Sequence, residues 1–294
     1  MNKNFYLCTK IKAKKINKPI LFYHVPKCAG TTFCVIFSWL LHPQTRVKGT
    51  LFKNNDKKGE TAFELFNRCF DYSVYNKFNF IFGHLPFETN NLFKKSYYKI
   101  SLIRNPIDRT ISHYNWMLKR QYCSQNEDVQ NLFDENKITK NTITNQFSGI
   151  GFTKKNDDKS LNLAYENLSK KINFLCKSEH IFNLFKYLIS SYNLPNLLFQ
   201  NQQVTKYQKN IFSTNLKKTI INNNSMDIEL YNMLCKNNIF KTKKILGEEI
   251  SDDRYFFSSP DIKIQNKKNI LINKNQYNSI KTKLMQNNFK INKI

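Results

Sequence analysis

Residues 19–32 read Pro19-Ile-Leu-Phe-Tyr-His-Val-Pro-Lys-Cys-Ala-Gly-Thr-Thr32, and this stretch decides the fold. Residues 19–25 form a short apolar run, rich in strand-forming side chains and ended by a proline, which predicts a buried strand. Residues 27–30 predict a loop, and residues 31–42, which stop before a second proline, predict a helix. A buried strand that leads through a tight loop into a helix favours an α/β fold with a parallel sheet.

The segments that follow continue this alternation. Strands are predicted at 78–82, 97–103 and 172–176, and helices at 159–171, at 179–191 and from Pro106 onward. Asn105 and Pro106 suit the N-cap and the first position of that last helix. The polar residues 44–60 predict a loop.

The two ends of the chain differ from the part between them. Residues 1–18 contain lysines and no acidic residue. Residues 251–294 are rich in lysine and asparagine and have weak periodicity, which predicts partial disorder. We therefore expect a basic N-terminal segment at 1–18, one folded domain at 19–250 and a Lys/Asn-rich C-terminal segment at 251–294.

The composition is that of a soluble globular protein. Of the 294 residues, 40% are hydrophobic and 14% aromatic, which is too many for a disordered chain. No apolar run approaches the roughly 18 residues of a membrane span, so no transmembrane segment is expected. The seven cysteines form no CxxC pair and no metal-ligand spacing. This pattern predicts reduced thiols in a cytoplasmic protein without a metal site.

The net charge of +26 raises the question of a nucleic-acid partner. Only six of the 47 basic residues are arginine, and much of the lysine lies in the two ends, 1–18 and 262–294, which contain no acidic residue. The charge is therefore consistent with an anionic ligand but does not require nucleic acid, which we do not expect as a partner.

The loop after the first strand has the features of an anion site. Small residues that lead into a helix point backbone N–H groups at one spot, and the helix dipole favours an anion there. Gly30 allows close approach, Thr31 and Thr32 add hydroxyl donors, and Lys27 adds a charge. It is not a Walker A loop, because Lys27 precedes the glycine instead of following it. The alternative is an ordinary strand–helix turn.

A second group of polar residues lies in Ile103-Arg-Asn-Pro-Ile-Asp-Arg-Thr-Ile-Ser-His-Tyr114. One face of the predicted helix is apolar, and the other presents Arg109, Ser112, Trp116 and Arg120. Arg104 lies at the end of the preceding strand. Arginine offers forked hydrogen bonds that suit phosphate or carboxylate. The alternative is that Arg109 and Arg120 only pair with Asp108 and Glu127 on a solvated helix.

Together these segments resemble the PAPS-dependent sulfotransferases, in particular the carbohydrate (heparan sulfate 2-O-like) sulfotransferases. Residues 26–32 resemble the 5′-phosphosulfate loop of that family, and residues 104–112 resemble its 3′-phosphate motif, R-x-P-x-x-R-x-x-S. Phe82-Gly-His-Leu85, between them, resembles the family's G-H segment, whose histidine is the catalytic base. Weaker matches extend the resemblance from about residue 19 to about residue 240.

The resemblance implies a P-loop NTPase-like fold, with a central parallel sheet flanked by helices. It implies an enzyme of the EC 2.8.2 type that uses 3′-phosphoadenylyl sulfate (PAPS) as donor, releases PAP and needs no metal. The acceptor would be a hydroxyl group, on a carbohydrate or another compound, which can be anionic.

The resemblance also assigns roles to residues. Lys27 and His84 would be catalytic, Lys27 by stabilising charge on the departing oxygen and His84 as the base. The cofactor would be held by Lys27, Cys28, Ala29, Gly30, Thr31, Thr32, Arg104 and Ser112. Asn145 departs from the family, which usually has an arginine at that position.

The five histidines are not equivalent. His84 follows a glycine at a strand end, where the active sites of open α/β sheets lie. His24 suits a packing role, and His113 could line the site, whereas His42 and His180 lie away from both motifs. Two other functions remain open from the residues alone: a basic module that binds nucleic acid or anionic glycan without catalysis, and a P-loop kinase.

Overall fold

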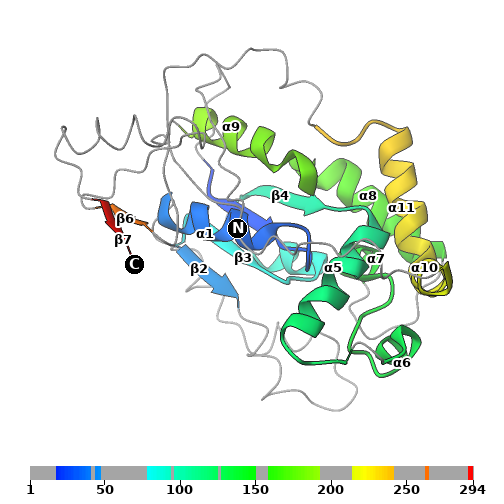
Figure 1. Cartoon of the computed structure of the whole chain (residues 1–294). Coiled ribbons are helices and arrows are strands. Elements are labelled where there is room, and N and C mark those ends of the chain that lie inside the picture. Colours follow the sequence, from blue (N-terminus) through cyan, green and yellow to red (C-terminus); the bar gives the residue numbers. More distant parts are fainter. Residues whose placement is uncertain are drawn as a thin grey trace.

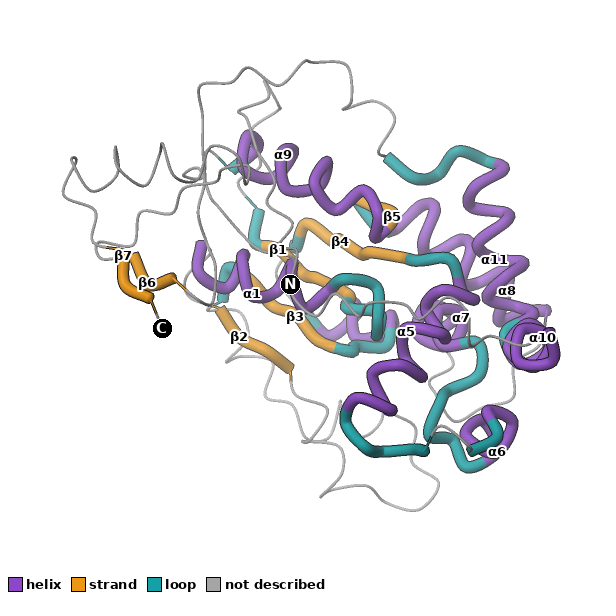
Figure 2. Tube along the Cα trace, in the orientation of Figure 1, coloured by secondary structure: helices purple, strands orange, loops and turns teal. Residues whose placement is uncertain are grey.

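The computed structural model describes residues 18–40, 44–47, 78–93, 96–124, 127–149, 158–192, 214–241, 262–264 and 291–293. Within these residues a parallel sheet lies in the middle of the molecule and helices surround it (Figures 1 and 2). The predicted α/β class with a central parallel sheet is therefore confirmed. The predicted boundaries at residues 18 and 250 stay predictions.

The sheet has five strands in the order β2-β3-β1-β4-β5, and every neighbouring pair is parallel. The strands are β1 (Ile20–Tyr23), β2 (Gln44–Val47), β3 (Phe80–Gly83), β4 (Tyr98–Ile103) and β5 (Phe174–Lys177). From β1 the chain builds β2 and β3 on one side, then crosses back over β1 to form β4 and β5 on the other. This reversal makes the carboxyl ends of β1 and β4 a topological switch point, where ligands bind in open α/β sheets.

Strand β1 is buried on both faces, and its alternating side chains define the two layers of the core. Phe22 points to one face, where its ring lies 4.4 Å from that of Phe33 (centroid to centroid). Tyr23 points to the other face, where its ring lies 5.3 Å from Phe87 and 5.9 Å from Phe147. A strand buried on both faces needs a continuous apolar run, which is the pattern by which β1 was recognised.

The helices predicted from the sequence are present. Their bounds, with those of the shorter turns, are α1 (Gly30–Leu40), η1 (Phe87–Leu92), α5 (Pro106–Lys119), α6 (Val129–Asp134), α7 (Thr142–Ser148), α8 (Asp158–Glu166), η2 (Asn167–Lys171), η3 (Ser178–His180), α9 (Ile181–Ser191), α10 (Thr214–Asn223) and α11 (Ser225–Lys236). Helix α5 begins as expected, with the Asn105 side chain accepting hydrogen bonds from the backbone N–H groups of Ile107 and Asp108.

The prediction of a loop at 44–60 is wrong for its first residues, because 44–47 form the edge strand β2. This strand pairs in parallel with β3, from Gln44 opposite Phe80 to Val47 opposite Gly83. Only one of its four residues is hydrophobic, so the pattern carried no strand signal, and the backbone pairing with β3 decides its conformation. Residues 48–60 lie outside the described residues.

The C-terminal segment also contains strand structure that its sequence pattern did not indicate. Strand β6 (Ile262–Ile264) pairs in antiparallel fashion with β7 (Ile291–Lys293). The expectation of partial disorder in the rest of this segment concerns residues outside the described ranges.

A buried polar network joins α5, α7 and the start of α11. Arg109 is only 1% exposed, and its Nη2 donates to the hydroxyl of Thr110 (3.1 Å) and to Oδ1 of Asn224 (3.4 Å). Asp227 is fully buried beside it and accepts from the backbone N–H groups of Ile143 (3.0 Å) and Thr144 (2.7 Å). Burial raises the pKa of Asp227, and the nearby charge of Arg109 acts against that rise.

The alternative that Arg109 lies on a solvated helix and pairs with Asp108 or Glu127 is therefore wrong. Glu127 pairs with Lys137 instead, at 2.9 Å. Helix periodicity placed Arg109 on the face opposite the apolar stripe, but residues 214–241 cover that face. Such coverage comes from a distant part of the chain, so a local pattern cannot reveal it.

We expect Arg109→Met to lower the free energy of unfolding by about 3–5 kcal/mol, because it leaves the Asp227 carboxyl buried without an opposite charge. Urea titration followed by circular dichroism measures this change. Lys140→Met is the control: it breaks the exposed ion pair with Asp134 (3.1 Å) and should change stability little. A variant at position 109 as stable as the natural protein would show that Asp227 does not need the guanidinium.

Candidate active site

Three of the sequence motifs meet at one edge of the sheet. The register aligns Tyr23 of β1 with Gly83 of β3 and with Ser101 of β4. The loop after β1, which carries Lys27, and His84 after β3 therefore start at the same level. Arg104 follows the last residue of β4 at the same edge. These residues are far apart in the sequence, and the parallel pairing brings them together at the switch point.

The loop between β1 and α1 has an unusual backbone. Lys27 and Ala29 both have positive φ, 67° and 60°, a conformation that costs an L-residue roughly 1–3 kcal/mol. The N–H groups of Cys28 and Thr32 bond within the loop, to the carbonyls of Val25 (3.3 Å) and Ala29 (3.1 Å). The two left-handed residues, on either side of Cys28, curl the backbone, and in known anion-binding loops a curl of this kind turns the remaining N–H groups toward one point.

Gly30 and Thr31 supply two of those remaining N–H groups. They begin helix α1, and neither N–H bonds to a backbone carbonyl of a described residue. Both are thus positioned to donate to an anion at the helix N-terminus, where the helix dipole also favours negative charge. The N–H groups of Cys28 and Thr32 instead hold the shape of the loop.

Gly30 has a second role, in packing. A Cβ added there would lie 2.0 Å from Cδ2 of His24, so any other residue would displace the His24 ring. That ring packs against the ring of His84, with 4.5 Å between centroids and the two planes tilted by 31°. Glycine at this position therefore sets how closely the loop approaches the histidine pair.

His84 is held by a hydrogen bond of 2.9 Å between its Nδ1 and the carbonyl oxygen of His24. A carbonyl only accepts, so Nδ1 carries the proton of this bond, and in the neutral ring Nε2 then carries the lone pair. This is the tautomer that a general base needs if Nε2 is to take a proton.

Gln146 is a residue of the site that sequence reasoning missed. It is fully buried on α7, and its Nε2 donates to the carbonyls of Leu85 (3.0 Å) and His24 (3.4 Å). It therefore ties together the two segments that flank the His84 ring. The sequence offered only a weak sign of this role, namely a side-chain amide in a short segment. A buried amide needs hydrogen-bond partners, but the sequence does not show that this amide is buried.

Lys27 lies in a strongly positive environment. Its Nζ is 5.3 Å from the ring centroid of Trp116, a cation–π contact. Burial and then the charge of Arg104 lower the pKa of Lys27 to about 8. Like charges held close together in a partly buried place suit a multiply charged anion, which would relieve their repulsion.

Cys28 links the loop to the end of β4. Its fully buried thiol lies against the backbone N–H of Arg104, and burial raises the pKa of Cys28 to about 12. The thiol therefore stays protonated and has a packing role. Ser112, the other residue of the second motif, lies in α5 and is nearly buried.

His113 also faces this region. Burial, followed by the charges of Arg109, Lys27 and His84, lowers the pKa of His113 to about 3. Its imidazole is therefore neutral at neutral pH and a weak base. His180 lies on η3, after β5, and His42 lies outside the described residues.

Asn145, at the position where the resemblance led us to expect arginine, has a local role. Its Nδ2 donates to the carbonyl of Lys140 at 2.8 Å and so stabilises the turn that leads into α7.

Among the described residues, no three His, Cys, Asp or Glu side chains are grouped so as to hold a metal ion. Likewise, none of the helices described has the length and apolar character needed to cross a membrane.

Comparison with protein families matches residues 15–162 to the sulfotransferase family. The matched residues are half of the chain and include the Lys27 loop, His84 and the Arg104 motif. A search of curated proteins found no match. The site described above lies within the matched residues at the switch point of a parallel sheet, and the chain belongs to the sulfotransferase family.

Proposed function

We propose that the protein transfers the sulfuryl group of PAPS to a hydroxyl group, and that the acceptor is a carbohydrate. The observation that carries the proposal is the meeting of the Lys27 loop with His84, whose Nδ1 bonds to the His24 carbonyl and leaves Nε2 as the basic nitrogen. The strand–loop–helix unit at β1 also supports a P-loop NTPase-like fold. The resemblance of three ordered motifs to carbohydrate sulfotransferases supports the acceptor class.

The residues present fit a nucleotide that carries one phosphate group at its 5′ position and another at its 3′ position. The N–H groups of Gly30 and Thr31, with Lys27, would hold the 5′-phosphosulfate side, where the left-handed loop concentrates donors. Arg104 and Ser112 would hold the 3′-phosphate. PAPS, when bound, supplies the sulfuryl group.

The side chains then account for the transfer step. Nε2 of His84 takes the proton of the acceptor hydroxyl as its oxygen forms a bond to sulfur. As the sulfuryl group passes from the nucleotide to the acceptor oxygen, Lys27 would stabilise the negative charge left on the phosphate oxygen that it leaves. The His24 carbonyl keeps its bond to Nδ1–H and stabilises the imidazolium that results. His113, with its low pKa, is too weak a base to replace His84.

We also propose that the reaction takes place in the cytoplasm, a proposal that rests on the cysteine pattern of the sequence. A P-loop kinase and a binding module without catalysis remain testable alternatives. Transfer of label from ³⁵S-PAPS to a glycan panel, compared with transfer from γ-³²P-ATP, separates sulfotransferase from kinase. Binding of DNA that weakens with salt, without binding of PAP, would favour the module.

PAP should raise the melting temperature more than AMP does, because AMP lacks the 3′-phosphate that Arg104 and Ser112 would bind. Arg104→Lys should weaken PAP about tenfold and leave AMP unchanged, since a point charge cannot reproduce the forked guanidinium. Differential scanning fluorimetry with both nucleotides measures this, and Arg120→Lys, at the exposed end of α5, is the control. Equal stabilisation by PAP and AMP would contradict the 3′-phosphate assignment.

PAP affinity should fall as pH rises above about 8. The free protein loses the Lys27 proton near that pH, whereas the bound phosphate favours the charged form and raises the pKa in the complex. Binding therefore takes up a proton at high pH, which isothermal titration calorimetry in two buffers detects. Lys27→Arg stays charged and should show no such change between pH 7 and 9.5. A constant affinity in the natural protein over this range would mean that Lys27 does not contact the phosphates.

His84→Ala should lower turnover by about 10²–10⁴-fold with nearly unchanged PAP affinity, because it removes the base and no phosphate contact. The natural enzyme should also lose rate on the acid side, as Nε2 becomes protonated. Turnover is measured from ³⁵S-PAPS across pH 5–8, with His180→Gln on η3 as control. Near-normal turnover in His84→Ala, together with loss of turnover in His113→Gln, would assign the base to His113.

A further inference from the structure

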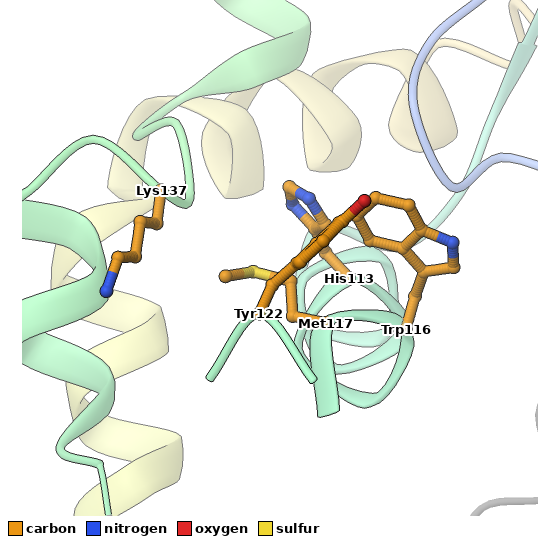
Figure 3. A pocket seen from close by; sticks show the side chains of 5 residues that line it. All are labelled: His113, Trp116, Met117, Tyr122 and Lys137. Atoms are coloured by element: carbon orange, nitrogen blue, oxygen red, sulfur yellow. The ribbon is translucent and has the colours of Figure 1, made fainter. Parts of the chain in front are cut away.

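A pocket of about 260 Å³ lies beside the candidate active site, lined by His113, Trp116, Met117, Tyr122 and Lys137 (Figure 3). Trp116 belongs both to this pocket and to the Lys27 contact, since the Lys27 ammonium lies 5.3 Å from its ring centroid. His113, at the same wall, interacts electrostatically with Lys27 and His84. The pocket therefore opens directly next to the groups assigned to sulfuryl transfer.

The wall of the pocket is aromatic and apolar. The Trp116 ring lies 5.4 Å from Tyr122 at 72° and 5.8 Å from the ring of His113. Tyr122 is 59% exposed, which is unusual for so large a side chain among the residues that the structure describes. A rigid aromatic wall with one side open to solvent suits the flat face of a ring-shaped ligand.

One polar atom of the wall has no partner. Nδ1 of His113 is buried and makes no hydrogen bond within the described part of the chain. A buried ring nitrogen without a partner is costly, and a small turn of the ring toward the pocket would let a ligand hydroxyl group satisfy it.

The opposite wall carries a cation that is already neutralised. Lys137 Nζ lies 2.9 Å from a carboxylate oxygen of Glu127 and 2.8 Å from one of Glu135. Residues 127–140 contain four carboxylates and two lysines, in a chain whose net charge is +26, and the second lysine, Lys140, pairs with Asp134. With two carboxylates, those of Glu127 and Glu135, on the one ammonium group of Lys137, this side of the pocket would repel an anionic acceptor.

We propose that this pocket binds the acceptor and that the acceptor is an uncharged, hydroxyl-bearing ring that stacks on the Trp116–Tyr122 wall. The inference rests on the proposed sulfuryl transfer and narrows the class of acceptor. The overall charge of the protein would favour an anionic sugar, but the carboxylates around Lys137 disfavour one in this pocket. A neutral sugar and a simple phenol share the required chemistry, and the test separates them.

Binding is measured without turnover. Trp39→Phe leaves Trp116 as the single tryptophan. With this protein saturated with PAP, its fluorescence is titrated with methyl glucoside, with methyl glucuronoside, which has a carboxylate on the same ring, and with 4-methylphenol. We expect at least one of the two uncharged rings to bind about tenfold more tightly than the glucuronoside. Whichever of methyl glucoside and 4-methylphenol binds more tightly then identifies the acceptor as a sugar or a phenol. Tyr122→Ala should weaken that binding about tenfold.

A charge variant tests the rim directly. Glu127→Gln with Glu135→Gln releases Lys137 and should improve glucuronoside binding about tenfold without changing the uncharged rings. Asp128→Asn with Asp134→Asn makes the same charge change on the same segment, away from Lys137, and should have little effect. Asparagine also keeps the N-cap that Asp128 provides to α6.

Three results would overturn the proposal. The first is that no probe binds, and the second is that the glucuronoside binds as tightly as both uncharged rings. The third is that Tyr122→Ala leaves the binding of the uncharged ring unchanged. Failure of the proposed function looks different, because PAP would then give no stabilisation and ³⁵S-PAPS no transfer. The fluorescence titration is also run without PAP, so that it reports on the pocket in either case.

Discussion

The backbone carbonyl of His24 is the contact on which the candidate site depends. It accepts a hydrogen bond from Nδ1 of His84 and a longer one from Gln146, so it sets the tautomer of the base and connects it to α7. The His24 ring occupies the space left by the missing side chain of Gly30 and packs against the ring of His84. One residue therefore couples the loop after β1, the loop after β3 and a helix from the other half of the domain. A shift of any of the three would move the imidazole.

The network behind α7 extends this coupling into the core. Asp227 binds the first N–H groups of α7, and Arg109 lies beside Asp227, so the helix that carries Gln146 is held at its N-terminal end by buried charges. The two arginines of the second motif thus have different physical tasks. Arg104 lies at the end of β4 next to Lys27, whereas Arg109 is buried and holds α7 and α11 in position. An arrangement of the helices that separated Arg109 from Asp227 would leave buried charges unpaired, which is strongly unfavourable.

The distribution of charge matters more than its sum. The net charge of +26 describes the whole chain, but the region around Lys27 and Arg104 is positive while the rim of the neighbouring pocket carries paired lysines and an excess of carboxylates. A site with a positive donor end and an acidic acceptor rim can hold a multiply charged nucleotide and still discriminate against an anionic acceptor. Because salt screens exposed charges that lie more than about 10 Å apart, nearby charge pairs affect specificity more than distant surface lysines do.

Local patterns were sufficient for much of this protein. The apolar run of β1, the Asn105–Pro106 helix start and the glycine-containing loop report short-range physics, namely burial, capping and backbone freedom, and each is found where the sequence predicted it. Four features could not be predicted from local patterns: the polar edge strand β2, the burial of Arg109, the hydrogen bonds of Gln146 and the ion pairs of Lys137. The first three depend on segments tens of residues away in the sequence. The ion pairs of Lys137 depend on how the turn around it folds back on itself. The sequence by itself determined which elements form and which chemical groups they carry; the tertiary structure alone decided which of those groups meet, because hydrogen bonds and charge pairs depend on distances that only packing sets.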